Sequence, residues 1–437
     1  MEHQEELNDL MKVRRAKLTR LQELGINPFA YTFSRDITAR DILDRFAELE
    51  EKSVSVAGRV LTLRSMGKAA FADIADASGK IQIYVRRDQV GDQAYEVFDL
   101  TDIGDLVGVT GTVHKTRTGE ITIFAQKFEL LTKSLRPMPV VKERVEEGQT
   151  VTYDAFADTE LRYRQRYLDL MVNRDVRQTF IARSRIVSAM RRYLDARGYL
   201  EVETPVLQPL YGGAAARPFV THHNALDMNL YLRIADELYL KRLIVGGFEG
   251  VYEISKDFRN EGIDRSHNPE FTMMELYVAY QDYHFMMGLV EEMVGTITAE
   301  VCGGTKISYQ GQELDFTAPW PRVRMFEALQ RYTGMDLYGK SRDELYAAAK
   351  ALHCEVEPFM ESGKILDEIV KEKVEPHLIQ PTFPATIRSS FRPWPNATAM
   401  IPGWLSASRP LSQDGKSVTP FPNSTIPSTN AAVSSSK

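Results

Sequence analysis

Five short β-segments crowded into residues 52 to 135 constrain the fold of this chain more than any other feature. They read VSVAGRVLTLRS, AAFADIADASG, KIQIYVRRD, LVGVTGTVHKTRTGE and ITIFAQKFELL, and glycine-bearing turns separate them. So many strands in so short a stretch suit a small Greek-key barrel of the OB type. Such a barrel offers one face to single-stranded nucleic acid, where an aromatic ring stacks on a base.

Three side chains of this region are candidates for contact with nucleic acid: Arg64, Phe71 and Gln82. A guanidinium holds phosphates, a phenyl ring stacks on bases and an amide binds base edges. Strand alternation alone explains Phe71 equally well as a core residue. Both interpretations of Phe71 stay open at this point.

Bulk properties limit the class of protein. A chain of 437 residues has room for two or three domains, and its formal charge of −6 means that any nucleic-acid contact must come from a local patch. Only two cysteines occur, Cys302 and Cys354, without CxxC spacing, which favours a reducing compartment. No apolar run reaches membrane-spanning length and the first residues are charged. We therefore expect neither a signal peptide nor an anchor, and a cytoplasmic location.

The first segment, residues 1 to 50, reads as a helical extension. Apolar residues recur at helical spacing from residue 4 to residue 25, and Gly25 and Pro28 close the pattern. The other side of this helix is cationic, and we expect it to be solvated, with contact to RNA as the alternative. The residues concerned are Lys12, Arg14, Arg15, Lys17 and Arg20.

A second distinctive pattern follows at ARSRIVSAMRRYLDARGYLEVETPVL, residues 182 to 207. Its first part has apolar residues at helical spacing and ends at Gly198, where a C-terminal glycine can stop a helix. An extended stretch follows, and Pro205 interrupts it because proline cannot donate to a strand ladder. The pattern predicts a helix, a tight stop and a broken strand.

The stretch FRNEGIDRSHNPEFTMMELY, residues 258 to 277, predicts a hairpin with a polar loop. Arg259 and Glu261 would lie at one end of it with Phe271 facing them. This arrangement fits ATP: Arg259 can clamp the α-phosphate, His267 can reach the distal phosphates, Glu261 can accept from the adenine amino group and Phe271 can cover the ring. A salt-bridged surface hairpin is the alternative.

These two stretches resemble motifs 1 and 2 of class II aminoacyl-tRNA synthetases, and LYGGAAARPFVTHHNALDMNLYLRIADELYLKRL, residues 210 to 243, is similar to the lysyl members. The resemblance runs from the amino-terminal helix to about Phe383. It implies an α+β fold with an N-terminal OB-type β-barrel over residues 51 to 135 and a linker over 136 to 170. A class II catalytic domain with an antiparallel sheet would follow over residues 171 to 383, incomplete at its C-terminus.

The resemblance also implies two sets of site residues. Glu237 would bind the α-ammonium of lysine, although on spacing alone it could equally pair with Lys241 one helical turn on. Glu275 would complete the lysine pocket, with an exposed acid on a strand as the alternative. The implied lysine-binding set is Gly213, Ala214, Glu237, Glu275 and Tyr277. The implied ATP-binding set is Arg259, which is also the catalytic residue, with Glu261, His267, Asn268 and Phe271.

The activity implied is attachment of lysine to tRNA(Lys). ATP and L-lysine would form lysyl-adenylate with Mg²⁺ neutralising the phosphates, and the tRNA would then take the lysyl group. Motif 1 implies a homodimer, and the barrel would bind the anticodon through Arg64, Phe71 and Gln82. Two alternatives stay open: a lysyl ligase acting on a translation factor, which should lack the barrel, and a non-catalytic relative that binds tRNA or other RNA.

Residues 384 to 437 break the pattern, because they are rich in Pro and Ser with Asp414 as their only acid. A shift of the reading frame permits family-like strings here; NSTIPSTNAAV, for example, permits ELNDPIDQRRR. We therefore hypothesise a frameshift, in the gene or in its reading, at about Phe383. Motif 3 and the family's magnesium ligands would then be missing, so no metal ligand is assigned, and this chain would be impaired in activity and stability.

Overall fold

The computed structural model describes residues 9–139, 142–146, 149–153, 156–264, 267–385 and 432–433. The chain divides into two compact units, Met1–Val172 and Asn173–Lys437. Each unit has its own buried apolar core, and the second unit has more than one. Among the described residues, no helix has the length and apolar character needed to cross a membrane.

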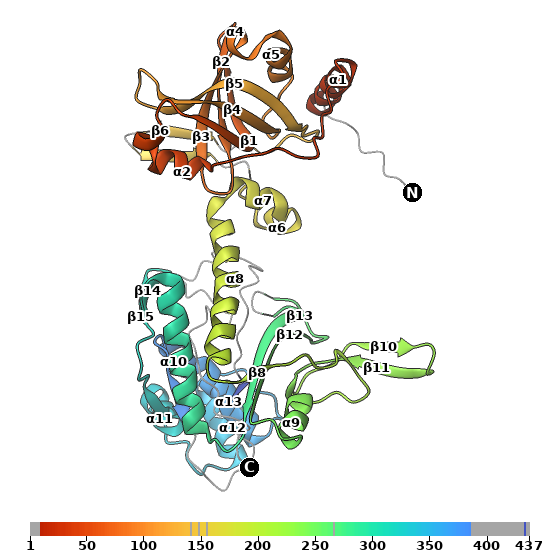
Figure 1. The fold of residues 1–437 in the computed structure, drawn as a ribbon. Coiled ribbons are helices and arrows are strands. Elements are labelled where there is room, and N and C mark those ends of the chain that lie inside the picture. The colour runs from red at the N-terminus through yellow and green to blue at the C-terminus, as the bar shows by residue number, and fades with distance from the viewer. Residues whose placement is uncertain are drawn as a thin grey trace. The chain divides into compact units, whose positions relative to one another are not determined.

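The first unit is built on a closed five-stranded barrel in the order β1-β2-β3-β5-β4, coloured orange in Figure 1. The alternation of apolar residues inside and polar residues outside favours closure, and β2 and β3 bury every second side chain. This confirms the predicted OB-type barrel. The strands are β1 (Ser53–Ser65), β2 (Ala69–Ala75), β3 (Lys80–Arg86), β4 (Leu106–Lys115) and β5 (Ile121–Thr132).

Short helices and one further hairpin accompany the barrel. The helix α5 packs on β5 and contributes the buried rings of Tyr95 and Phe98 to the barrel core. The accompanying elements are α2 (Ala39–Asp44), α3 (Phe46–Leu49), α4 (Arg87–Val90), α5 (Asp92–Asp99), β6 (Lys142–Glu146), β7 (Gln149–Tyr153), α6 (Thr159–Arg164) and α7 (Arg166–Val172).

The amino-terminal helix α1 (Asp9–Glu23) corrects one expectation about its cationic face. Arg14 is only 8% exposed, and its guanidinium donates to the carbonyls of Ser134 and Ile103, each at 2.8 Å. Lys17 pairs with Asp102 at 2.6 Å. The expectation that Arg14 is solvated was wrong, because this side chain fixes the helix to the barrel through buried carbonyl groups.

The second unit is built on a four-stranded sheet in the order β18-β13-β12-β8. Its centre is the antiparallel hairpin of β12 (Gly250–Phe258) and β13 (Glu270–Val278), which pair over their whole length from Gly250↔Val278 to Phe258↔Glu270. The antiparallel sheet predicted for this domain is confirmed, and the segment after the polar loop is a strand. The outer strands are β8 (Leu200–Glu201) and β18 (Ala432–Val433).

Two long helices cover one face of this sheet. The helices α8 (Arg174–Asp195) and α10 (Tyr283–Cys302) bury Tyr193, Leu194 and a row of methionines against Tyr252, Met274 and Leu276 of the hairpin. Gly198 has a φ of +77° and ends the helical conformation after α8, as predicted. Pro205 lies between two short strands, β8 and β9 (Leu207–Gln208), so the predicted broken strand is confirmed.

The opposite face of the sheet carries a single helix, α9 (Glu237–Val245). Leu240 of α9 packs on Val251 and Tyr277. The rest of this face carries Glu253, Ser255, Asp257, Phe271, Met273 and Glu275. A hairpin of β10 (Val220–His223) and β11 (Met228–Leu232) leads the chain into α9. The start of α9 lies against this sheet, because the backbone N–H of Asp236, just before α9, donates to the carboxylate of Glu275 on β13 at 3.2 Å.

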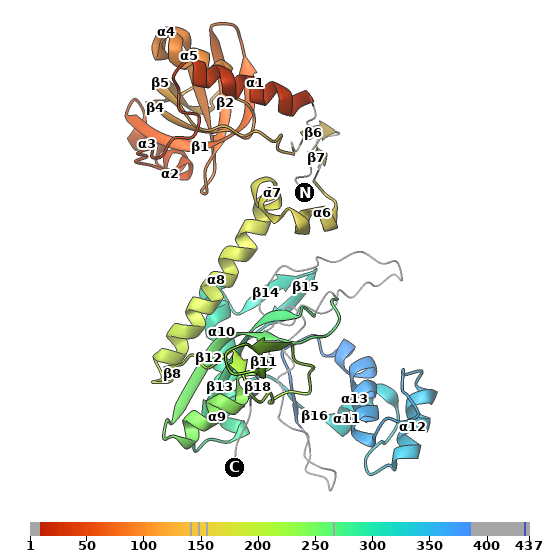
Figure 2. The ribbon, with the colours of Figure 1, turned by 90° about the vertical axis from the view of Figure 1, so that its right-hand side faces the viewer.

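The remaining helices form a separate apolar cluster, drawn as the blue group at the right of Figure 2. The strand β17 pairs in parallel with β16, and Phe383 is buried against Trp320 with ring centroids 5.4 Å apart. The frameshift proposed at about Phe383 falls almost wholly outside the described residues. The elements are β14 (Lys306–Tyr309), β15 (Gln312–Asp315), β16 (Arg322–Arg324), α11 (Met325–Thr333), α12 (Arg342–Ala351), α13 (Ser362–Lys373), a 3₁₀ turn (Glu375–His377) and β17 (Phe383–Ala385).

Candidate functional site

The β12–β13 hairpin separates its side chains by chemistry. Successive residues of a strand point to opposite faces, so the apolar Tyr252, Met274 and Leu276 face α8 and α10. The alternate residues share the other face, where Glu253 lies opposite Glu275 across the two strands. Charged residues are thus collected on the face that carries α9.

Arg259 follows directly after β12 and lies against Phe271 of β13. Its guanidinium carbon is 5.1 Å from the centre of the Phe271 ring, and both side chains are half-buried. The guanidinium also lies 3.4 Å from the carbonyl oxygen of Ile234. The structure therefore brings the predicted phosphate clamp and the predicted ring-covering residue together at one end of the hairpin.

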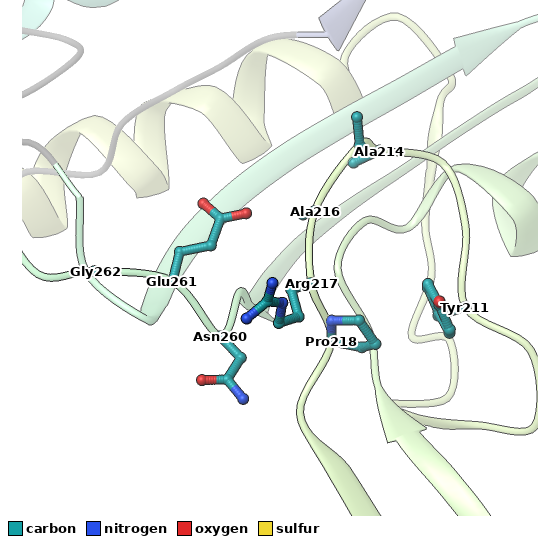
Figure 3. Close-up of a pocket in the computed structure, with 9 residues that line it drawn as sticks. Tyr211, Ala214, Ala216, Arg217, Pro218, Asn260, Glu261 and Gly262 are labelled. Carbon is teal, nitrogen blue, oxygen red and sulfur yellow. The ribbon is translucent and has the colours of Figure 1, made fainter.

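Glu261 lines a cavity of about 740 Å³ with Ala214 of the predicted lysine set. Figure 3 shows the two walls: Asn260, Glu261 and Gly262 on one side, and Ala214, Ala216, Arg217 and Pro218 on the other. The backbone N–H of Asn260 donates to the carbonyl of Arg217 at 2.7 Å, which ties the two walls together. One residue from each of the two predicted substrate sets thus borders the same hollow.

His267 and Asn268 lie on the return side of the polar loop. The imidazole Nδ1 of His267 is 2.8 Å from the carboxylate of Asp264, and this side chain is exposed. The amide of Asn268 donates to the carbonyl of Glu270 at 2.6 Å. Both side chains are thus held by residues close to them in the sequence, at the loop end of the hairpin.

Gly213 faces the start of α9. It has a φ of +91°, and a Cβ atom built on it would lie 2.9 Å from Cβ of Glu237. A larger residue at this position would be strained and would displace Glu237. A glycine is therefore required at this close approach to Glu237 and to Ala235, whose Cβ would lie 3.1 Å away.

Glu237 forms the helix pair that its spacing allowed. Its carboxylate accepts from the ammonium of Lys241 at 2.6 Å, one turn further along α9. The same ammonium lies 6.0 Å from the centre of the Tyr277 ring. Glu237 is thus placed beside Tyr277, and Lys241 supplies its present counter-ion.

Glu275 is buried, so the alternative of an exposed acid on a strand was wrong. Its side chain is 2% exposed, and it accepts from the hydroxyl of Tyr277 at 3.0 Å and from the backbone N–H of Asp236 at 3.2 Å. Burial, with the nearby charge of Asp236, raises the pKa of Glu275 to about 7. Glu275 and Tyr277 therefore act as one polar unit.

Four further buried charged residues surround Glu275, and the sequence reasoning missed them. Arg233 is central: its guanidinium lies 2.6 Å from Glu253, 3.1 Å from Asp236 and 3.3 Å from Asp257. Burial and neighbouring negative charges raise the pKa of Asp236, and burial is the leading cause of the raised pKa of Asp257. The alternation in EISKD could have placed Glu253 and Asp257 on the face of Glu275.

Carboxylate oxygens of Asp236, Asp257 and Glu275 lie within 4.8 Å of one another, a spacing that a metal ion could use. The guanidinium of Arg233 already contacts two of these three groups. A metal ion that bound all three carboxylates would have to displace this guanidinium. We therefore assign no metal centre to this group among the described residues.

The three nucleic-acid candidates share the outer surface of the barrel. Arg64 lies directly opposite Phe71 across β1 and β2, and Gln82 follows on β3 opposite Asp73. Phe71 is half-exposed while its neighbours Ala70 and Ala72 are buried, so the alternative that Phe71 is a core residue was wrong. Gln82 accepts from the hydroxyl of Thr122 at 2.9 Å.

Phe71 begins a row of rings on this surface. Its ring stacks on Tyr84 at 4.5 Å, and Tyr84 meets Phe124 at 5.1 Å. His114 approaches the other side of Phe124 at 5.0 Å. The sequence reasoning missed Tyr84 and Phe124, although both stand at outward positions of their strands.

Comparison with known proteins gives the class of the protein. The family of class II tRNA synthetases (D, K and N) matches residues 158–413, and an OB-fold nucleic acid binding domain matches residues 54–131. The barrel and the antiparallel sheet with its charged hairpin therefore define an aminoacyl-tRNA synthetase of class II. The match of the synthetase family extends past Phe383.

The most similar relatives narrow this class. A lysine--tRNA ligase of Carboxydothermus hydrogenoformans is 54% identical over 384 residues, which cover 88% of this chain and 76% of the relative. Lysine--tRNA ligases of Pelotomaculum thermopropionicum and Bacillus cytotoxicus are 53% and 51% identical, and the matched residues cover 87% of this chain and 74% and 75% of those proteins. The chain belongs to the lysine--tRNA ligase family.

Proposed function

We propose that this chain attaches lysine to tRNA(Lys) in an ATP-dependent reaction that passes through lysyl-adenylate. One observation carries the proposal: the register of β12 and β13 gathers Phe271, Glu275 and Tyr277 on a single face of one sheet, and Arg259, directly after β12, lies against Phe271. A clamp for a phosphate and a buried acid for an ammonium thus lie in one hairpin. The names of the relatives support lysine as the amino acid and tRNA as its acceptor.

The nucleotide would lie at the open end of the hairpin. Arg259 would bind the α-phosphate, where negative charge develops when the lysine carboxylate attacks, so its contribution is larger in the transition state than in the ground state. Phe271 would cover the adenine ring and Glu261 would accept from its amino group. His267 and Asn268, on the return side of the loop, would reach the distal phosphates.

Lysine would lie between the hairpin and α9. Glu237 would bind the α-ammonium, and Gly213 and Ala214 would let the backbone approach the substrate closely. Glu275, held by Tyr277, would complete the polar pocket. Such positioning and charge stabilisation suffice for this chemistry, which needs no nucleophilic side chain.

The tRNA would be bound through the outer surface of the barrel. Phe71 would stack on an anticodon base, with Arg64 on phosphate and Gln82 on a base edge. We also propose a homodimer formed through α8 and the strands that follow it, a cytoplasmic location, and the domain limits 1–50, 51–135, 136–170, 171–383 and 384–437 set out above.

We propose further that this chain as written is impaired. Under the frameshift hypothesis, motif 3 and the acids that hold Mg²⁺ are replaced by residues 384–437, so the metal that would neutralise the phosphates has no assigned ligand here. Sequencing the gene and its transcript across codons 380 to 390 tests this. An unshifted read that gives PATIRSS in both would remove the hypothesis.

Exchange of pyrophosphate into ATP in the presence of lysine, β-lysine, aspartate or asparagine tests the activity. We expect lysine-dependent exchange by a frame-corrected chain and little or none by the chain as written. Exchange driven by aspartate or asparagine would contradict the choice of amino acid. Robust exchange by the uncorrected chain would contradict the impairment and leave the choice of lysine intact.

A second function has one observation in its favour. The barrel is complete and its row of half-buried rings lies on the outer surface, so binding of tRNA does not depend on the segment after Phe383. A non-catalytic RNA-binding protein would retain tRNA affinity without adenylation. The presence of the barrel speaks against the other alternative, a lysyl ligase acting on a translation factor.

A further inference from the structure

Buried negative charge exceeds buried positive charge behind the proposed lysine pocket. We call Asp236, Asp257 and Glu275 the acid cluster. All three are at most 2% exposed. The charged groups that face them from α9, β12, β13 and the end of β11 are Glu237, Glu253, Arg233, Lys241 and Arg259. With every group ionised, five carboxylates face three cations.

The hydrogen bonds of the acid cluster do not remove this excess. Ser255 has a single hydroxyl proton, and its oxygen lies 2.7 Å from Asp236 and 3.2 Å from Asp257, so it can donate to only one of them at a time. Among the described residues, Oδ1 of Asp236 and Oδ2 of Asp257 are buried and accept no hydrogen bond, although Nη1 of Arg233 lies 3.1 Å from the first of them as an ion pair. Leaving such oxygens without a donor is costly.

The acid cluster is joined directly to the residues proposed for lysine. The backbone N–H of Asp236 donates to Glu275, and Asp236 immediately precedes Glu237 in the chain. Both oxygens of Glu275 are already engaged, one by Asp236 and one by Tyr277. A cationic group that approaches Glu275 therefore enters the field of Asp236 and Asp257 as well.

We propose that Asp236 and Asp257 are specificity-determining residues, which make the pocket select an amino acid with a cationic side chain, and that binding this cation releases a proton from the acid cluster. The inference rests on the proposed function and deepens it. Neither residue belongs to the lysine-binding set that the family resemblance implied. They act through Glu275, so they are positioning residues and not catalytic ones.

The ionisation of the acid cluster agrees with this role. Burial raises the pKa of Asp236, Asp257 and Glu275, that of Glu275 to about 7. At neutral pH the empty cluster therefore holds a proton that an arriving ammonium displaces. Affinity for lysine should accordingly fall as the pH falls below the pKa of Glu275, because the proton and the ammonium compete for the same negative charge.

Isothermal titration calorimetry on the full 437-residue chain tests the inference. L-lysine is compared with 6-hydroxynorleucine, in which a hydroxyl replaces the ε-ammonium, and each titration is run in two buffers of different ionisation enthalpy. We expect about one proton to be released per lysine at neutral pH and none with the hydroxyl analogue. The preference for lysine should shrink about tenfold from pH 8 to pH 5.5.

Asp236→Asn and Asp257→Asn keep the shape of the side chain and remove its charge. Each should lower the preference for lysine over 6-hydroxynorleucine about tenfold and leave the affinity for the analogue nearly unchanged, a pattern that general misfolding would not give. Asp343→Asn is the matched control, because it removes the same charge from an exposed position at the start of α12. Its binding should equal that of the wild type.

The wild-type proton count needs no variant, so the inference stays testable if a substitution prevents folding. Lysine binding without proton release, and with an unchanged preference in both variants, would overturn the inference and leave the proposed function standing. If both this chain and its frame-corrected version failed to bind lysine while they still bound an ATP analogue, the proposed function would fall, and this inference with it.

Discussion

The outer surface of the barrel and the α9 face of the β12–β13 sheet are built from the same strand alternation. They differ in where their polar and charged side chains lie: at the solvent on the barrel, and inside the protein on the sheet. On the barrel, polar and aromatic residues such as Arg64 and Phe71 point to solvent. On the sheet, Glu253, Asp257 and Glu275 point into the protein. Solvent makes the first arrangement inexpensive, whereas the second retains ionisable groups at a cost in stability.

This difference indicates how each surface would recognise its ligand. On the barrel surface, separate rings and cations would each contact a different base or phosphate of the nucleic acid. The contributions of these contacts to affinity should therefore be nearly independent of one another. The acid face is coupled, since Arg233 alone contacts three carboxylates. Substitutions there should change affinity, pH dependence and stability together.

The largest expected effect tests whether the two surfaces are functionally separate. Arg259→Ala in the frame-corrected chain should lower lysine-dependent pyrophosphate exchange about a thousandfold, because it removes the group that would balance charge on the α-phosphate. Binding of tRNA, measured by filter retention, should be unchanged. Lysine-dependent exchange within tenfold of the unsubstituted protein would remove Arg259 from the mechanism.

A smaller effect tests the barrel in the same way. Phe71→Ala should weaken binding of a tRNA(Lys) anticodon stem-loop about tenfold to a hundredfold, because one stacking surface is lost. Pyrophosphate exchange should not change. Tyr84→Ala is the companion variant, since its ring lies under that of Phe71. If both variants bound the stem-loop normally, the bases would have to lie on another part of the barrel.

The two regions were not equally readable from the sequence. The barrel followed from the spacing of short strands and glycines, and the hairpin followed from a charged loop between apolar segments, because both are local patterns. The group around Arg233 was missed, since its members come from the segment between β11 and α9 and from β12 and β13, and meet only when the strands pair. Burial of Glu275 depends on the same pairing, and that of Arg14 depends on distant carbonyls.

The pH dependence of stability should have opposite signs in the two regions. Burial by itself raises the pKa of Asp76 in the barrel, but hydrogen bonds from Ser78, Ala39 and Gly79 outweigh it and lower that pKa. Its stabilising contribution is therefore present above its ordinary pKa and is lost in acid. Asp236 has a raised pKa, so its contribution to stability is present in acid and is lost as the pH rises toward neutrality.

Replacing each aspartate by asparagine, which has the same shape and no charge, should change the free energy of unfolding with opposite signs in the two regions. At pH 8 we expect Asp236→Asn to stabilise the second unit and Asp76→Asn to destabilise the first, each by about 1–2 kcal/mol. The gain from Asp236→Asn should disappear near pH 4, whereas the loss from Asp76→Asn should still be present there and should shrink only at more acidic pH. Hydrogen exchange measured separately for amides of each unit gives the two free energies of opening. Equal signs for the two variants at pH 8 would contradict the contrast between the two regions.

The smallest expected effect decides between the two roles of Glu237. Its carboxylate is now paired with Lys241, and a half-exposed helix pair of this kind contributes only about 0.3–0.5 kcal/mol to stability. Lys241→Met should therefore hardly change the free energy of unfolding.

If Glu237 binds the α-ammonium of lysine, removing Lys241 should tighten lysine binding about twofold to threefold, because the substrate no longer displaces the ammonium of Lys241. If Glu237 serves only the helix, calorimetry will give the same lysine affinity for both proteins. Lys340→Met is the control, since it breaks an exposed pair of the same i,i+4 spacing, with Glu344 of α12.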